Sequence, residues 1–321
     1  MASSGEAPDR RPVSRGSIVL VYVGVAALWG STWLVVRLGL EHLPPLLFAG
    51  VRMALAAVLL TPLAIRGGLY RLPPAALRRV AEVGLLQIAI PYGLLFAAQQ
   101  WVPSALAAIL FATFPVWITV VAWQLLPGER LTPVRAASVA LGVAGVVVLE
   151  APHLAGVAAS GRLALGSALV VAASIVVAVA NVAARRHLVA VSPYALVAGQ
   201  SAVGAVALLA ASALLERGRA AEFTLGAWGA IAYLAVFGTG LTYVGLYWLL
   251  PRISIAAVGA IPLLDTTVAV GLGAAVLGEE VGWPLAAGGA MVLAAAGLAS
   301  RPAAGNVPRA SAVARRPDVA A

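Results

Sequence analysis

Ten long apolar runs dominate this sequence, and each is close to the length that an α-helix needs to cross a bilayer. The hydrocarbon core is about 30 Å thick, which takes about 20 mostly apolar residues in helical form. Only 10% of the residues are charged, against about 25% in a soluble domain. We therefore predict an all-α polytopic membrane protein with ten transmembrane helices, at residues 17–40, 44–65, 80–100, 102–125, 134–150, 163–185, 193–215, 227–250, 254–278 and 282–300.

The distribution of arginine predicts the orientation of these spans. All 21 basic residues are arginine, and basic residues in short loops mark the cytoplasmic side. With the N-terminus inside, 16 arginines fall in cytoplasmic segments, 3 in outer loops, and Arg37 and Arg52 within spans. We predict a multi-pass protein of the cell (plasma or inner) membrane with both termini cytoplasmic. The arginines do not line one face, so we expect no nucleic-acid partner.

The two halves of the chain are similar at a shift of 151 residues. At this shift Tyr92 falls on Tyr243, and Glu129 falls on Glu280. Each unit holds five spans, an odd number, so the second copy enters the membrane with opposite polarity. Two such inverted repeats place a binding site near the bilayer midplane and support alternating access.

These repeats define the predicted domain organisation. The first five-helix repeat covers residues 17–150 and the second covers 163–300, with a linker at 151–162. The polar segments 1–16 and 301–321 are predicted to be disordered cytoplasmic tails.

Four motifs occur in order along the spans. The first span reads LWGSTWLVVRLGL, the second FAGVRMALAAVLLTP, and the turns after spans four and nine read PGERLTP and LGEEVGWP. Together with the spans and the repeat, these motifs resemble the drug/metabolite transporter superfamily, specifically its EamA-type ten-helix permeases. The sequence departs from the family at IPLLDTT, where Asp265 and Thr266 replace the usual Leu-Glu-Pro pattern, and in the sixth span, which lacks the usual tryptophan. The resemblance covers residues 17–300 and implies transport of amino acids, other metabolites or toxic compounds, commonly as export.

Asp265 and Arg52 are predicted substrate-binding residues, because a charge inside the bilayer is costly and marks a functional site by default. Asp265 lies about 15 Å into span nine, near the midplane, where it would bind a substrate amine or take up a proton. Arg52 lies about 12 Å deep and could hold a carboxylate or phosphate in a bidentate grip. Structural roles stay open: Asp265 could pair with an arginine, and Arg52 could extend toward the outer surface.

Aromatic and polar residues complete the predicted substrate-binding site. Trp29, Ser31 and Thr32 would supply a stacking wall and hydrogen bonds, although close helix packing through Ser31 is an alternative. Tyr92 and Tyr243 are included because the repeat pairs them. Further polar residues are expected mainly as interhelical hydrogen-bond partners: Gln87, Gln99, Asn181, Gln200, Thr239, Thr242 and Tyr247.

The remaining ionisable groups are expected to be structural. Arg37 is expected to anchor the end of its span, and Glu129, Glu279 and Glu280 are expected to brace tight turns. The chain has no cysteine, and its histidines fall at span ends or in loops. We therefore predict no metal site and no cofactor.

The predicted function is secondary transport of a small organic metabolite, amino acid or drug by alternating access. Export is the expected direction, and proton coupling and homodimer formation are open options. An uncoupled facilitator or a lipid-linked sugar flippase of the same fold remains an alternative. A membrane-embedded enzyme is less favoured, because Asp265 is the single mid-membrane carboxylate in the predicted spans and paired-carboxylate chemistry needs two. We predict that the protein is not an enzyme.

Overall fold

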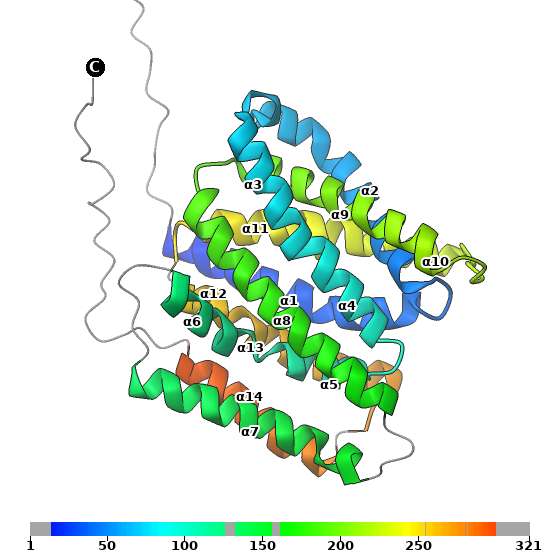
Figure 1. The fold of residues 1–321 in the computed structure, drawn as a ribbon, viewed down its shortest axis with the longest axis vertical. Coiled ribbons are helices and arrows are strands. Elements are labelled where there is room, and N and C mark those ends of the chain that lie inside the picture. Colours follow the sequence, from blue (N-terminus) through cyan, green and yellow to red (C-terminus); the bar gives the residue numbers. More distant parts are fainter. Residues whose placement is uncertain (1–13, 126–131, 156–160, 254, 281, 300–321) are drawn as a thin grey trace, which may run out of the picture.

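The computed structural model describes residues 14–125, 132–155, 161–253, 255–280 and 282–299. Within these ranges all regular secondary structure is helical, as Figure 1 shows. The elements are α1 (Arg15–Gly39), α2 (Pro45–Arg66), η1 (Leu69–Arg71), α3 (Pro74–Gly84), η2 (Leu85–Ala89), α4 (Ile90–Ala98), α5 (Ser104–Phe111), α6 (Phe114–Leu125), α7 (Pro133–Ala155), α8 (Gly161–His187), α9 (Pro193–Leu215), α10 (Leu225–Ala235), η3 (Val236–Leu241), α11 (Thr242–Leu249), α12 (Ile255–Gly259), α13 (Ile261–Leu277) and α14 (Trp283–Ala299).

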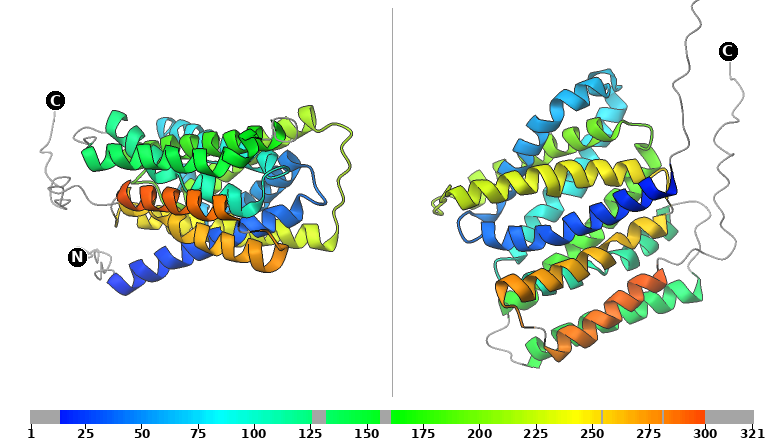
Figure 2. Two further views of the ribbon diagram at one scale, coloured as in Figure 1. Left: turned by 90° about the horizontal axis from the view of Figure 1, so that it is seen from below. Right: turned by 180° about the vertical axis from the view of Figure 1, so that it is seen from behind.

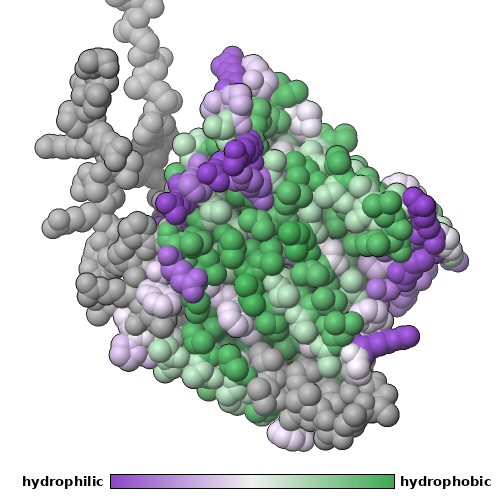
Figure 3. Space-filling model, viewed as in Figure 1, coloured by the Kyte–Doolittle hydropathy of each residue, from purple (hydrophilic) through white to green (hydrophobic). Residues whose placement is uncertain are grey.

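Eight helical segments in the described residues are long and apolar enough to cross a membrane. The other two, α7 and α14, have shorter apolar stretches, Ala136–Gly145 and Trp283–Ala295. Figure 3 shows a broad apolar face between hydrophilic patches at two opposite edges, close to the two ends of the helices. The prediction of an all-α polytopic membrane protein is confirmed, and the exact count of ten spans stays a prediction.

Corresponding helices of the two halves pack against each other. The α2–α9 pair and the α7–α14 pair lie on opposite sides of the bundle (Figures 1 and 2). The α7–α14 pair is antiparallel, because a Cβ on Gly142 would contact Ala295, whereas one on Gly145 would contact Val292. Antiparallel pairing of equivalent helices is what two five-helix repeats of opposite polarity produce.

A π-helical turn recurs at the same place in both repeats. The segment η2 begins at Leu85 and η3 begins at Val236, positions 151 residues apart. A π-turn inserts one extra residue into a helix and changes which side chains face inward after it, and it is frequent at functional sites. Because matches of Ala, Val and Leu arise easily by chance, this shared irregularity is the more specific structural sign of the repeat.

Small differences from the predicted spans occur at helix ends. The helix α7 continues to Ala155, past the predicted end of the fifth span at residue 150, and α8 begins at Gly161. Glu129 lies outside the described residues, so its predicted placement opposite Glu280 stays untested.

Candidate functional site

A cavity at the centre of the bundle is lined by side chains from both repeats. Its polar lining comes from α1, α2, η2, α4, α8, α11 and α13, and aromatic rings form much of the remaining wall. The polar residues are Thr32, Arg52, Gln87, Tyr92, Gln99, Asn181, Tyr243 and Asp265, and the aromatic wall also includes Trp29, Trp33, Phe96, Phe111 and Phe114. A largely apolar pocket with a few convergent polar groups is the usual form of a small-molecule site.

The Arg52 guanidinium is held on one side of this cavity by neutral groups. Its Nε donates to Thr239 Oγ1 at 3.0 Å, and its Nη2 donates to the Gly238 carbonyl at 2.9 Å. The guanidinium carbon also lies 4.8 Å from the centre of the Tyr92 ring, within the range of a cation–π contact. Only 2% of Arg52 is exposed. A Cβ on Gly238 would lie 2.9 Å from Arg52 Nη2, so glycine at this position in η3 makes room for the guanidinium.

The Asp265 carboxylate lines the same cavity and has few hydrogen-bond partners. Only 3% of the residue is exposed, and its Oδ1 accepts one long hydrogen bond from Thr266 Oγ1 at 3.4 Å. The Thr266 hydroxyl also lies 2.6 Å from the Pro262 carbonyl, so it is shared between acceptors. Across the described chain, neither Asp265 nor Arg52 has a partner of opposite charge within ion-pair distance. The pairing of Asp265 with an arginine, one of the structural roles that the sequence left open, is therefore absent from the described residues in this conformation.

Glycine on α1 brings Asp265 to the cavity wall. A Cβ on Gly30 would lie 2.5 Å from the Asp265 carbonyl oxygen and 2.6 Å from Val268 Cβ. Real side chains do not tolerate such distances, so only glycine permits this approach of α1 to α13. Close approach through small residues is typical of helix packing in membranes.

The two tyrosines that the repeat pairs meet inside the cavity. The Tyr92 and Tyr243 hydroxyl oxygens lie 3.2 Å apart. The network continues on one side to Arg52 Nη2, 3.5 Å from Tyr92 Oη. On the other side Gln87 Nε2 lies 3.5 Å from Tyr243 Oη, and Asn181 Nδ2 donates to Gln87 Oε1 at 3.1 Å. One polar chain thus joins α2, α4, η2, α8 and α11.

Most of the predicted substrate-binding residues lie together. Asp265, Arg52, Trp29, Thr32, Tyr92 and Tyr243 all line the cavity. Ser31 does not: its hydroxyl contacts the Leu28 carbonyl and the Tyr233 hydroxyl, each at 2.7 Å. Neighbouring helix positions differ by about 100° in direction, so Thr32 faces the cavity while Ser31 faces α10.

Some lining residues could not be singled out from the sequence. Gln87, Gln99 and Asn181 were expected to be interhelical partners, yet all three also line the cavity. The Nε2 of Gln99 is buried without a hydrogen-bond partner in the described structure. The lining positions Trp33, Phe111 and Phe114 carry no local signal that separates them from core residues. No group of three or more His, Asp or Glu side chains that could hold a metal occurs in the described ranges.

Comparison with known proteins identifies the family. The sequence profile of the EamA-like transporter family matches the chain twice, at residues 16–150 and 164–301. The chain belongs to the EamA-like transporter family. It is a multi-pass membrane transporter, and the two matches correspond to its two repeats. The resemblance inferred from the sequence motifs is confirmed.

Transporters of Escherichia coli and Bacillus subtilis are similar to this chain over most of their length. The inner membrane transporter YedA of Escherichia coli K12 is 31% identical over 271 residues, which covers 83% of each chain. The transporter YoaV of Bacillus subtilis strain 168 is 25% identical, over 74% of this chain and 80% of YoaV. A solved crystal structure has a TM-score of 0.63 at 23% identity and covers 89% of this chain and 97% of its own. That last likeness concerns the fold alone.

Proposed function

We propose that this EamA-like transporter is a secondary exporter of small organic solutes that carry both an amine and a carboxylate, such as amino acids, in the cell membrane. The observation that carries the proposal is one shared cavity with Arg52 on one wall and Asp265 on another, neither neutralised by an opposite charge in the described structure. A buried charge without a partner is costly. A zwitterionic solute would supply a partner to each group at once.

The geometry of the two groups indicates how such a solute would be oriented, with its carboxylate at Arg52 and its ammonium at Asp265. Arg52 uses Nε and Nη2 for protein contacts, and its Nη1 has no hydrogen bond within the described residues, so that N–H group can bind a carboxylate oxygen. Asp265 accepts only from Thr266, so its second oxygen can accept from an ammonium. The aromatic wall would contact an apolar or aromatic side chain.

Proton coupling would follow from the same carboxylate. When no amine is bound, Asp265 remains buried with one weak hydrogen bond, and uptake of a proton removes the cost of the uncompensated charge. Substrate amine and proton would then compete for Asp265. Exchange of the two across the membrane gives coupled transport, whereas a facilitator would carry the solute without a proton.

The test is transport into proteoliposomes with three solutes of matched size: a zwitterionic amino acid, its decarboxylated amine and its deaminated acid. We expect transport of the zwitterion, acceleration by an opposing pH gradient, and loss of both in Asp265→Asn. Thr267→Ala is the matched control, since Thr267 is exposed and lies two positions along the same helix. Equal transport of all three solutes would overturn the substrate class, and gradient-independent transport would favour the uncoupled facilitator.

A further inference from the structure

At one end of the bundle, two glutamates of the second repeat accept hydrogen bonds from the first turns of two helices of the first repeat. At this end, the latch end, α2 and α5 begin and α9 and α13 end. We propose that Glu216 and Glu279 form a reversible latch that closes the central cavity at this end, so that the repeats must release both carboxylates before the cavity opens there. With both termini in the cytoplasm, the latch end faces outward.

Glu279 follows the end of α13 and binds the first turn of α5. Its Oε1 accepts from the Ser104 backbone N–H at 2.8 Å and from the Ser104 hydroxyl at 2.7 Å. Its Oε2 accepts from the Ala105 backbone N–H at 2.9 Å. The free N–H groups of a first helical turn attract anions. Both carboxylate oxygens are therefore used to hold a helix of the other repeat.

Glu216 repeats this arrangement at the end of α9. Its Oε1 and Oε2 accept from the backbone N–H groups of Leu46 and Leu47, both at 2.9 Å, in the first turn of α2. Its Oε2 also accepts from the Ser212 hydroxyl at 2.8 Å. Only 8% of Glu216 is exposed. The two glutamates thus make the same kind of contact at two places, each between a helix end of one repeat and a helix beginning of the other.

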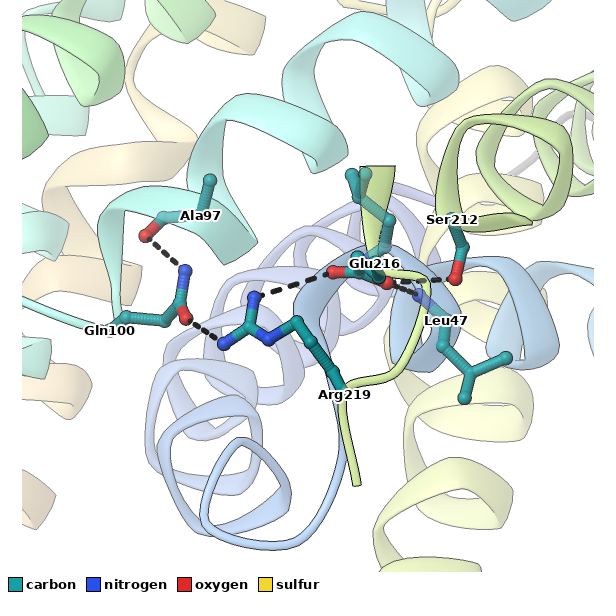
Figure 4. A network of polar contacts seen from close by, with 7 residues as sticks. Leu47, Ala97, Gln100, Ser212, Glu216 and Arg219 are labelled. Carbon is teal, nitrogen blue, oxygen red and sulfur yellow. Dashed lines mark hydrogen bonds and ion pairs between the residues drawn. The ribbon is translucent and has the colours of Figure 1, made fainter. Parts of the chain in front are cut away.

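A third contact between the repeats lies beside Glu216, as Figure 4 shows. Arg219 Nη2 donates to Gln100 Oε1 at 2.8 Å, and Arg219 Nη1 lies 3.9 Å from Glu216 Oε1. Gln100 follows α4, directly after the cavity-lining Gln99, whose carbonyl accepts from Arg37 Nη1 at 2.7 Å. These contacts connect the latch to the wall of the cavity at Gln99.

The opposite end is joined differently within the described residues. There the Tyr22 hydroxyl donates to the Ala257 carbonyl at 2.9 Å, and Arg186 Nη1 donates to the Leu125 carbonyl at 3.3 Å. In each of these contacts the acceptor is one uncharged backbone carbonyl. The carboxylate contacts between the repeats that the described residues make therefore lie at the latch end.

A latch of this kind is reversible because all its groups can exchange protein partners for water. The exposed N–H groups of a separated helix end and the freed carboxylate are both well hydrated. Glutamine in place of glutamate keeps the shape but leaves one acceptor oxygen and puts an N–H₂ group against a backbone N–H. Glu279→Gln therefore weakens the latch without changing the volume of the side chain.

The experiment uses the absence of cysteine from the sequence, so that one introduced thiol reports alone. Val36→Cys lies in the cavity lining toward the latch end, and Val258→Cys lies in the lining toward the opposite end. Each is combined with Glu279→Gln, and each is labelled in vesicles with a membrane-impermeant maleimide added from the latch side. Glu280→Gln is the matched control, because Glu280 is the next residue and is exposed.

We expect Glu279→Gln to raise the labelling rate of Val36→Cys by about tenfold, as the loss of one charge-assisted contact would, and Glu280→Gln to leave it unchanged. Ser104→Ala, which removes one of the three hydrogen bonds, should give a smaller rise and keeps the test valid if Glu279→Gln folds poorly. Equal labelling rates in the Glu279→Gln and Glu280→Gln backgrounds, with lowered thermal stability in the former, would show a static brace and overturn the latch. Labelling needs no substrate, so this result is independent of the proposed solute class.

Discussion

At the scale of residues, the cavity contains one basic and one acidic side chain, and these come from different repeats. Arg52 lies on α2 and Asp265 on α13. Their importance follows from the sequence, because ionisable residues within apolar spans are rare and expensive. Their separation could not be predicted, since it depends on Thr239 and Gly238 in η3, which occupy Arg52 Nε and Nη2.

The guanidinium shape of Arg52 is expected to matter as much as its charge. A lysine at this position keeps the charge but cannot donate to Thr239 and Gly238 and bind a substrate at the same time. We predict that Arg52→Lys lowers the initial rate of transport at least about tenfold, a loss of about 1.4 kcal/mol. Arg252→Lys, at an exposed arginine stacked on Trp248, is the control. A wild-type rate in Arg52→Lys would show that a point charge is sufficient.

The Tyr92–Tyr243 contact is expected to appear as an energetic coupling. Either single change to phenylalanine leaves the other hydroxyl in the buried network with one partner fewer, which costs about 1–3 kcal/mol. The double change removes both groups, so its cost should be less than the sum of the single costs by about 1 kcal/mol. Urea or thermal unfolding of the four proteins in detergent measures this cycle. Strict additivity would mean that the 3.2 Å separation carries no interaction.

At the scale of elements, the length of the apolar runs predicts where the helices lie, but it does not predict which of their faces point inward. The α1 and α2 boundaries lie within two residues of the predicted spans, because a short loop that contains Glu41 and His42 separates the two helices and α2 begins at Pro45. The π-turns η2 and η3 could not be predicted, since LLQIA and VFGTGL share no residue pattern. Each π-turn changes the direction of the side chains that follow it in the helix. Regular α-helical periodicity therefore does not predict that Tyr92 and Tyr243 face each other.

The approach of α1 to α13 is expected to depend on one glycine. Gly30→Ala would place a Cβ 2.5 Å from the Asp265 carbonyl oxygen, and overpacking of this kind costs about 1–3 kcal/mol. We predict a lower melting temperature for Gly30→Ala and reduced transport, because Asp265 is displaced. Gly24→Ala on the same helix is the matched control, with no atom within 4 Å of the added carbon. Equal stability of the two variants would contradict the close packing.

At the scale of the whole molecule, composition predicts a helix bundle in the membrane, and the similarity at a shift of 151 residues predicts that it consists of two inverted repeats. The match of the family profile to both halves and the paired packing of α2 with α9 and α7 with α14 agree with that prediction. The complete lining of the cavity could not be derived from the sequence, because most of its wall is made of apolar residues that resemble any other buried position.

If the two repeats have opposite polarity, equivalent loops should face opposite sides of the membrane. Tyr70 precedes α3 in the first repeat, and Phe223 precedes α10 in the second, and both are exposed. Single cysteines at these positions should react with an impermeant maleimide from opposite sides of the membrane, with Tyr70→Cys on the cytoplasmic side. Labelling of both from the same side would refute the inverted topology and, with it, alternating access by exchange of the two halves.

The tyrosine pair has a mechanical consequence. Residues related by an internal two-fold rotation can touch their own equivalents only on the rotation axis, and Tyr92 and Tyr243 do so. When two inverted halves exchange conformations, points on that axis stay where they are while everything away from it moves. In transport by exchange of the two halves, the hydroxyl pair would serve as the fixed point, and Arg52 and Asp265, which have no charged counterparts across the axis, would move relative to it.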